Sequence, residues 1–444
     1  MAESSKMEKV DEQGIIHTKL TFPEMYSTSM GMIIGAGIIT STGICIGYTG
    51  SGVWIGFLLA GIALLLTYAP AIIGSAVVPK TSANYYMASC ISKKMGGFYI
   101  MVSMISYLNI AFMAMSFGQY MVTIVPAGSM RFWAVVCLTA FYSANFLEQK
   151  LVAKVQAVMT VLLVLGWASF LALGLPKVNW GVFTLDQMFP KGSFGMLESV
   201  ATLLFAMGGG LWLVDAGGRI ENPEKNIIRG NLAAVGTAIV LFGLISAVAV
   251  GVLPIADVIN QPLTYVAKQI YPGGTYVLFV MTGALLALAT TINARYLDSG
   301  NKLIRSAQEG WFPKSFAKRN KNNVPYIFMT IVYLISLLPI IAGFNIAYLS
   351  RFAAATTGIV AIIPNIGFIY LIKKHPEEWK NSRWHMSKTF MVILYLLSSL
   401  ILIVLTYRNM RTLDPILWGA LVAYLVLSFI YANYRSKNVT EMGA

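Results

Sequence analysis

The fold class of this chain is decided by the stretch GMIIGAGIIT, residues 31–40. It lies inside an apolar run as long as a membrane helix, yet it contains three glycines, and glycine is a poor helix former. A second cluster of this kind, AMGGGLW at residues 206–212, lies inside a later apolar run. Both clusters therefore weaken a helix in its middle, where lipid offers no partner for a free backbone group.

Composition indicates a membrane protein. The chain has 444 residues, of which 57% are hydrophobic and 11% are charged, whereas a soluble domain carries about 25% charged residues. The charged residues are concentrated between apolar runs of about 20 residues, the length that crosses a hydrocarbon core about 30 Å thick. Strands of an outer-membrane barrel would instead alternate every second residue. We therefore predict an all-α polytopic membrane protein.

Hydropathy predicts twelve transmembrane helices. Their ranges are 24–48, 53–78, 98–125, 132–147, 152–174, 197–217, 228–253, 274–300, 326–343, 347–372, 388–407 and 413–434. The segment 82–98, between the second and third spans, is predicted to be either an amphipathic helix on the inner membrane surface or a plain loop.

The basic residues predict the orientation. Of the 32 Lys and Arg residues, 24 lie on the side of the membrane that also holds both termini. Because cytoplasmic loops carry the excess of Lys and Arg, we expect both termini in the cytoplasm of a multi-pass protein of the cell membrane. The same rule accounts for the net charge of +14, which therefore does not indicate a nucleic-acid partner.

The two glycine clusters lie in the first and the sixth predicted span. Interrupted segments at matching positions of two halves are typical of inverted-repeat transporters, and an odd number of spans in each half reverses the second half in the membrane. The predicted domains are a cytoplasmic tail (1–23), a first repeat (24–174), a second repeat (197–372), two further helices (388–434) and a second cytoplasmic tail (435–444).

An interrupted membrane helix has free backbone groups, which survive only where they line a cavity. The N-terminus of a half-helix offers free N–H donors and suits a carboxylate, whereas free carbonyls suit an ammonium group or a cation. An α-amino acid carries both groups. The alternative interpretation is helix packing, because Gly31 and Gly35 have the spacing of a GxxxG motif. The presence of two clusters at matching positions favours the interrupted helix.

Several segments resemble one transporter family. GMIIGAGII and FAMGGGLWLVDAGGRIENPEKNI (205–227) are similar to the first and sixth spans of the amino acid–polyamine–organocation transporters. The segments NIA (109–111), VQAVMTVL (155–162), EGWFP (309–313) and IP (363–364) resemble the bacterial arginine/agmatine-type antiporters most closely. The resemblance covers nearly the whole chain. It implies a LeuT-like fold with a five-plus-five inverted repeat, discontinuous helices 1 and 6 and two additional C-terminal helices.

The resemblance also implies substrate-binding positions in the first, third, sixth and tenth spans. They are Ile34, Gly35, Ala36, Gly37, Ile38, Asn109, Phe205, Met207, Gly208, Gly209, Gly210 and Thr357. This chain departs from the arginine/agmatine branch where that branch has an acidic residue, here Leu211, and where it has a pocket tryptophan, here Arg295. The lysine that replaces a cation in many sodium-independent relatives is Leu163 here.

Charges inside a span are costly and usually face a cavity or a partner, which makes Arg295, Asp298 and Asp215 notable. Arg295 is predicted either to bind a substrate carboxylate through its planar fork or to pair with Asp298 or Asp215. Asp298 and Asp215 are candidate coupling residues. If Arg295 faces the substrate, a neutral or acidic amino acid is favoured over arginine.

The sequence contains no phosphate-binding loop, metal-ligand spacing or catalytic triad pattern, so we expect neither an enzyme nor a cofactor or metal. We predict a secondary transporter that works by alternating access as an exchanger; the alternative is a proton- or sodium-coupled symporter. The expected partners are a small amino acid or amine and the lipid bilayer, with a homodimer as a candidate assembly.

Overall fold

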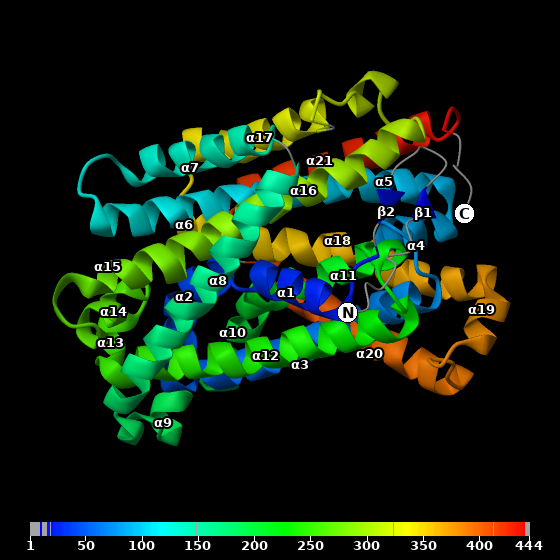
Figure 1. Cartoon of the computed structure of the whole chain (residues 1–444). Coiled ribbons are helices and arrows are strands. Elements are labelled where there is room, and N and C mark those ends of the chain that lie inside the picture. Colours follow the sequence, from blue (N-terminus) through cyan, green and yellow to red (C-terminus); the bar gives the residue numbers. More distant parts are fainter. Residues whose placement is uncertain are drawn as a thin grey trace, which may run out of the picture.

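Long helices run side by side through the molecule, and short helices and loops lie at their ends (Figure 1). The computed structural model describes residues 9–10, 16–17, 19–147, 149–322, 324–411 and 413–439. Within these ranges, the side chains of residues 9–10, 16–17, 36, 149–157, 297–302 and 305 lie outside the description. Two short strands, β1 (Lys9–Val10) and β2 (Ile16–His17), form an antiparallel pair before the first helix.

The helices of the predicted first half are α1 (Phe22–Ile33), α2 (Ala36–Thr49), α3 (Val53–Val77), α4 (Ala83–Ile91), α5 (Lys93–Met104), α6 (Asn109–Ile124), α7 (Met130–Ala144) and α8 (Gln149–Gly174). A connecting segment with the short helix α9 (Leu185–Met188) follows. Those of the predicted second half are α10 (Gly192–Met207), α11 (Trp212–Asp215), α12 (Pro223–Val252), α13 (Ile255–Val258), α14 (Thr264–Ile270), α15 (Tyr276–Phe279), α16 (Leu286–Gln308), α17 (Tyr326–Ile341) and α18 (Ile346–Lys374). The chain ends with α19 (Pro376–Asn381), α20 (Lys388–Met410) and α21 (Pro415–Arg435).

Every predicted span overlaps one or more of these helices. Among the described residues, nine helical stretches are long and apolar enough to cross a bilayer, and one of them, Gly37–Val77, combines parts of the first two predicted spans. Two further apolar helices, α7 and α17, are shorter, with 15 and 16 residues. The prediction of a helical, multi-pass membrane protein is confirmed, whereas the number of twelve crossings stays a prediction.

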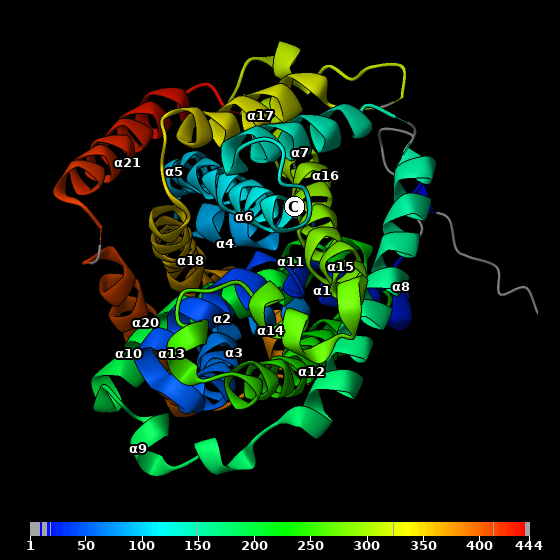
Figure 2. The ribbon, with the colours of Figure 1, turned by 90° about the vertical axis from the view of Figure 1, so that its left-hand side faces the viewer.

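Seen along the bundle, α1 and α2 lie near its middle, and α8, α20 and α21 lie at its edge (Figure 2). Burial agrees with this arrangement. In the stretch that contains α5 and α6, 67% of an 18-residue apolar segment is buried inside the protein. The corresponding share is only 22% in α20 and 17% in α21. The peripheral helices therefore present apolar side chains outward, as a lipid-facing surface requires.

The bundle has two ends that differ in structure. We call the end that carries α13, α14 and α9 the α14 end, and the end that carries α4, α19 and the strands the α4 end (Figure 1). The segment 82–98 lies at the α4 end and is helical, but Tyr85, Tyr86 and Met87 are buried in the protein. Of the two alternatives, the plain loop was therefore wrong: the segment is helical, and the buried face of α4 packs on α18.

Candidate functional site

The first predicted span is interrupted between α1 and α2. Ile34 (φ −75°, ψ 90°) and Gly35 (φ −152°, ψ −150°) have extended backbone between the last residue of α1 and the first residue of α2. Gly35 precedes α2 and has no side chain to cap the helix. The first N–H groups of α2 thus lie in the protein interior without a side-chain cap, where they can serve an anion.

The sixth predicted span changes its helical form rather than unwinding. After α10 ends at Met207, residues Gly208–Leu211 form a 3₁₀ turn, and the short helix α11 follows. The three glycines form this tight turn, in which hydrogen bonds join residues three apart instead of four. The predicted loop at Met207, Gly208, Gly209 and Gly210 is therefore a tightened helix. Fewer backbone N–H and C=O groups lose their hydrogen-bond partners there than in an extended break.

The two interruptions lie against each other. A Cβ atom on Gly209 would collide with the Met32 backbone of α1, and one on Gly37 would collide with the backbone of Ala206 in α10. Glycine is required at both positions because only a hydrogen atom fits between the two backbones. The glycines thus serve both helix packing and helix interruption, because close packing of α1 and α2 on the sixth span brings the two interruptions into contact.

Most of the predicted positions of the first and sixth spans meet there. Ile34, Ile38, Phe205 and Met207 are all buried. The side chain of Ala36 lies outside the described residues. Gly35 lies next to α16, where a Cβ atom would come within 2.5 Å of Thr291 Oγ1.

One face of α6 links the third span to this place. Asn109, Phe112 and Ser116 recur at i, i+3 and i+7, the spacing of a single helix face. Phe112 meets Phe205 edge to face, with ring centroids 5.9 Å apart. Ser116 Oγ accepts a hydrogen bond of 3.0 Å from Thr40 Oγ1 of α2. The predicted residue Asn109 therefore belongs to the same face that contacts α2 and α10.

In the tenth span, Thr356, the neighbour of the predicted Thr357, lies next to Asn109. Thr356 Oγ1 lies 3.4 Å from Asn109 Oδ1 and also 2.9 Å from the Phe352 carbonyl of its own helix. Thr357 Oγ1 donates to the Ala353 carbonyl at 2.8 Å. The sequence reasoning missed Thr356, Phe112, Thr40 and Ser116. The repeat of Asn109, Phe112 and Ser116 along one face was the available signal for two of them, but nothing in two adjacent threonines tells which one faces α6.

Arg295 lies one turn along α16 from the residue that touches the first interruption. Thr291 and Arg295 are spaced i, i+4 and therefore share a helix face. Arg295 Nε is buried without a hydrogen-bond partner, and the guanidinium interacts electrostatically with Tyr68 of α3. The side chain of its predicted partner Asp298 lies outside the described residues.

Asp215 lies toward the α4 end. Its carboxylate Oδ1 accepts a hydrogen bond of 3.0 Å from the Asn84 N–H, and its carbonyl accepts one of 2.7 Å from the Ser82 N–H. A carboxylate at the first turn of α4 stabilises that helix through its free N–H groups and its dipole. Asp215 therefore fixes α11 to the N-terminus of α4.

A second buried acid that the sequence reasoning did not select lies at the same end. Glu309 is 3% exposed and accepts a hydrogen bond from the Tyr85 hydroxyl, which itself accepts one of 3.0 Å from Trp311 Nε1. The Trp311 ring lies directly over Gly97 of α5, where a Cβ atom would overlap it. These side chains join α4, α5 and the segment after α16. Among the described residues, no group of His, Cys, Asp and Glu is placed to hold a metal ion.

Comparison with known proteins assigns the chain to a family. Residues 20–433 match the model of the amino acid permease family. The amino-acid permease RocE of Bacillus subtilis is 26% identical over 366 residues, which cover 77% of this chain and 75% of that protein. The gamma-aminobutyric acid permease of the same organism is 23% identical over 465 residues, covering 97% and 96%.

The methylthioribose transporter of Bacillus subtilis is 24% identical over 445 residues, covering 92% of this chain and 91% of that protein. These relatives are permeases and transporters rather than enzymes, and their names give different substrates. Because the family model extends over nearly the whole sequence, the chain belongs to the amino acid permease family of the amino acid–polyamine–organocation superfamily.

Proposed function

We propose that this chain is a secondary active transporter that exchanges amino acids or related amines across a bacterial plasma membrane by alternating access. The observation that carries the proposal is the contact between the two interruptions, Ile34–Gly35 and Gly208–Leu211, in the middle of the bundle. Interrupted backbone at membrane depth is tolerated where it lines a ligand site. The amino acid transport of the family supports the substrate class.

In this proposal, the N–H groups at the start of α2 bind the substrate carboxylate. They carry the positive end of the α2 dipole, and no side chain caps them. The 3₁₀ turn, Asn109 and Thr356 supply acceptors for the amino group, and Phe205 with Phe112 closes the site toward the α14 end. Thr357 lines the site from α18.

Arg295 provides a second carboxylate ligand or repels cationic substrates. Its place on the Thr291 face of α16 and its buried, unbonded Nε support this role. A guanidinium binds a carboxylate through two parallel hydrogen bonds and repels a guanidinium or diamine. The favoured substrate is therefore a neutral or acidic amino acid. Strong exchange of arginine for agmatine by the purified chain would contradict this assignment.

The proposed architecture is a five-plus-five inverted repeat with twelve crossings, two of them C-terminal to the repeats. Both termini are cytoplasmic, as the excess of Lys and Arg indicates. The helices α4 and α19, which follow the second and the tenth predicted span, lie at the end of the bundle that also carries the N-terminal strands (Figure 1). This agrees with loops on one side of the membrane that share that side with the N-terminus. A homodimer is the proposed assembly.

Asp298 is the first coupling candidate, and Asp215 is the second. If protonation of Asp298 drives transport, Asp298→Asn flattens the pH dependence of uptake while wild-type uptake varies with pH. Asp215→Asn is the comparison, because Asp215 also caps α4 and its loss destabilises that helix. An unchanged pH profile in Asp298→Asn would remove this residue from the coupling mechanism.

The direct test uses purified protein in liposomes. Labelled L-leucine, L-glutamate, 4-aminobutyrate, L-arginine and agmatine are supplied outside, with and without the same unlabelled compound inside. An exchanger takes up label only when the vesicles contain substrate. Uptake into empty vesicles that follows a proton or sodium gradient would instead indicate a symporter, and the absence of uptake under all conditions would contradict a transport function for these compounds.

A further inference from the structure

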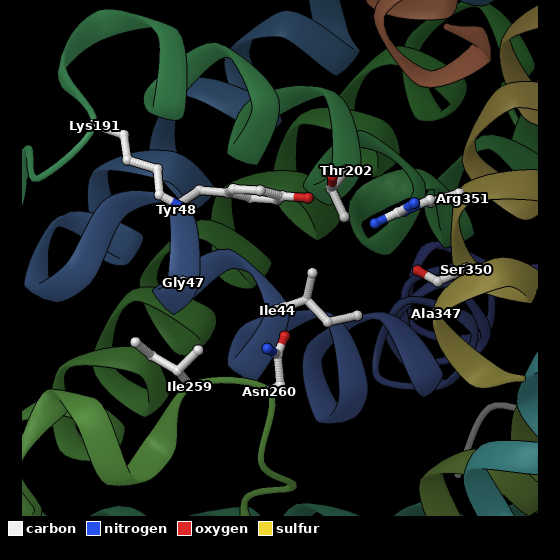
Figure 3. Close-up of a pocket in the computed structure, with 10 residues that line it drawn as sticks. All are labelled: Ile44, Gly47, Tyr48, Lys191, Thr202, Ile259, Asn260, Ala347, Ser350 and Arg351. Carbon is white, nitrogen blue, oxygen red and sulfur yellow. The ribbon is translucent and has the colours of Figure 1, made fainter. Parts of the chain in front are cut away.

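A cavity of about 230 Å³ opens at the α14 end of the bundle. It is bordered by α2, by α10 and the residue before it, by the start of α18 and by the segment between α13 and α14 (Figure 3). Its volume is far above the ~15 Å³ that a single water needs, so a small zwitterion fits. The cavity is exposed to the surroundings, since Lys191, Asn260 and Arg351 are exposed.

The same three helices connect this cavity to the proposed substrate site. On α2, the cavity residue Ile44 lies about 12 Å beyond Ala36 at a rise of 1.5 Å per residue. Thr202 on α10 and Ser350 on α18 lie about 8 Å and 10 Å along their helices from Met207 and Thr357. On α10, Phe205 lies between Thr202 and Met207, and its ring meets that of Phe112. The cavity therefore lies farther toward the α14 end than the proposed substrate site, and α2, α10 and α18 contribute residues to both.

The charges around the cavity are positive. The ten residues that line it include Lys191 and Arg351 but no acidic residue. Lys191 Nζ lies 5.3 Å from the ring centroid of Tyr48. The Tyr48 hydroxyl points toward Thr202 and Arg351 and interacts with the Arg351 guanidinium (Figure 3). The ring of Tyr48 thus extends across the cavity between the two cations.

Glu198 and Asp414 lie near residues of the cavity, and both have contacts outside it. Glu198 on α10 forms an ion pair with Arg408 of α20, whose guanidinium also lies 3.9 Å from the ring centroid of Phe194. Asp414 interacts with Tyr348. Arg408 balances the charge of Glu198, and Asp414 does not line the cavity, so the lining itself carries the two positive charges of Lys191 and Arg351.

We propose that this cavity is an outer recognition site that binds the carboxylate of an incoming amino acid before it reaches the helix interruptions. The inference depends on the proposed transport function and deepens it. Arg351 and Lys191 attract and hold the carboxylate, and Asn260 and Thr202 provide hydrogen-bonding side chains on opposite walls (Figure 3). A cationic cavity also disfavours amines that lack a carboxylate, so selection begins outside the central site.

The test compares Lys191→Gln and Arg351→Gln with the control Lys268→Gln. Lys268 is an exposed lysine at the same end of the bundle, and it also lies over a tyrosine ring, that of Tyr276 at 5.4 Å, but it does not border the cavity. Each variant loses one positive charge. Uptake of labelled L-leucine, L-glutamate and 4-aminobutyrate from outside is measured in cells that express each protein.

We expect each cavity variant to raise the apparent KM for the transported carboxylate about three- to tenfold, with little change in maximal rate and none in Lys268→Gln. The difference from wild type should shrink at high ionic strength, because salt screens exposed charges. Inhibition by 3-methylbutylamine, the decarboxylated form of leucine, should not weaken in either cavity variant.

The outcomes separate the two proposals. If wild type takes up a carboxylate and both cavity variants keep its apparent KM, the outer site is contradicted while the transport function stands. An equal loss of affinity for the carboxylate and the amine would also contradict it, because a carboxylate site distinguishes them. If wild type takes up none of the three compounds, the proposed function is contradicted and the outer site with it.

Discussion

The two ends of the bundle differ in how they close the path to the helix interruptions. At the α14 end, Tyr48, Lys191 and Arg351 border a cavity of about 230 Å³. At the α4 end, the described residues Ser82, Tyr85, Ser103 and Asp215 border a space of about 20 Å³. The cavity at the α14 end is thus large enough for a small molecule, whereas the space described at the α4 end is not.

The closed end is held by specific polar contacts rather than by apolar packing alone. Tyr85, Glu309 and Trp311 form a buried hydrogen-bonded chain, and Asp215 caps the neighbouring helix α4. A buried polar network of this kind favours one arrangement strongly while it is satisfied, and it must be broken before the helices separate. The comparison indicates a state that is open at one end, as alternating access requires of each of its two limiting states.

The largest effect is expected at the contact between the interruptions. Gly37→Ala places a methyl group into the Ala206 backbone, so α2 and α10 must separate. We expect uptake to fall at least about tenfold and the unfolding temperature to decrease, since overpacking costs about 1–3 kcal/mol. The matched control is Gly236→Ala on α12, where a Cβ atom meets nothing within 4 Å. Equal uptake by the two variants would show that close contact of the interruptions is not needed.

A smaller but selective effect is expected at Arg295. Arg295→Gln removes the charge and the fork while keeping hydrogen-bonding groups, and we expect the apparent affinity for a carboxylate substrate to fall about tenfold. Arg131→Gln serves as the control, because Arg131 bonds the Gly343 carbonyl at the bundle surface. If Arg295→Gln lowers only thermal stability and leaves KM and the choice between carboxylate and amine unchanged, Arg295 is a structural residue.

Loss of the Tyr85 hydroxyl is expected to raise severalfold the rate at which a cysteine at the α4 end reacts. Tyr85→Phe removes a donor to Glu309 and an acceptor for Trp311, and a buried group that loses its partner costs about 1–3 kcal/mol. The α4 end should therefore open more often. A cysteine introduced at Ser103 should react about three- to tenfold faster with a maleimide in this variant. Tyr142→Phe, which loses a similar hydroxyl contact to Thr330, should leave that rate unchanged; an equal increase would mean general loosening.

The sequence predicts the helices well because lipid requires long apolar runs, and it locates both interruptions because glycine disrupts helices. It does not distinguish the extended break at Ile34–Gly35 from the 3₁₀ turn at Gly208–Leu211. That difference depends on how closely the two backbones approach, which Gly37 and Gly209 permit but do not specify.

Side-chain pairing was harder to predict. The predicted span 388–407 ends before Arg408, yet Arg408 is buried within α20 and paired with Glu198 of α10. Likewise, the choice of Thr356 over Thr357 depends on the rotation of α18 against α6. Such contacts join residues far apart in the chain, and hydropathy along the sequence carries no information about them.

The most direct test of alternating access compares cysteines at the two ends. Thr202→Cys, in the open cavity, and Ser103→Cys, at the closed end, are both partly buried, and each is made in a chain without Cys45, Cys90 and Cys137. Without substrate, the account predicts fast maleimide labelling at position 202 and slow labelling at position 103. A transported amino acid should slow the first reaction and accelerate the second. Labelling rates that do not respond to substrate, or that change in the same direction at both positions, would contradict alternating access between these two ends.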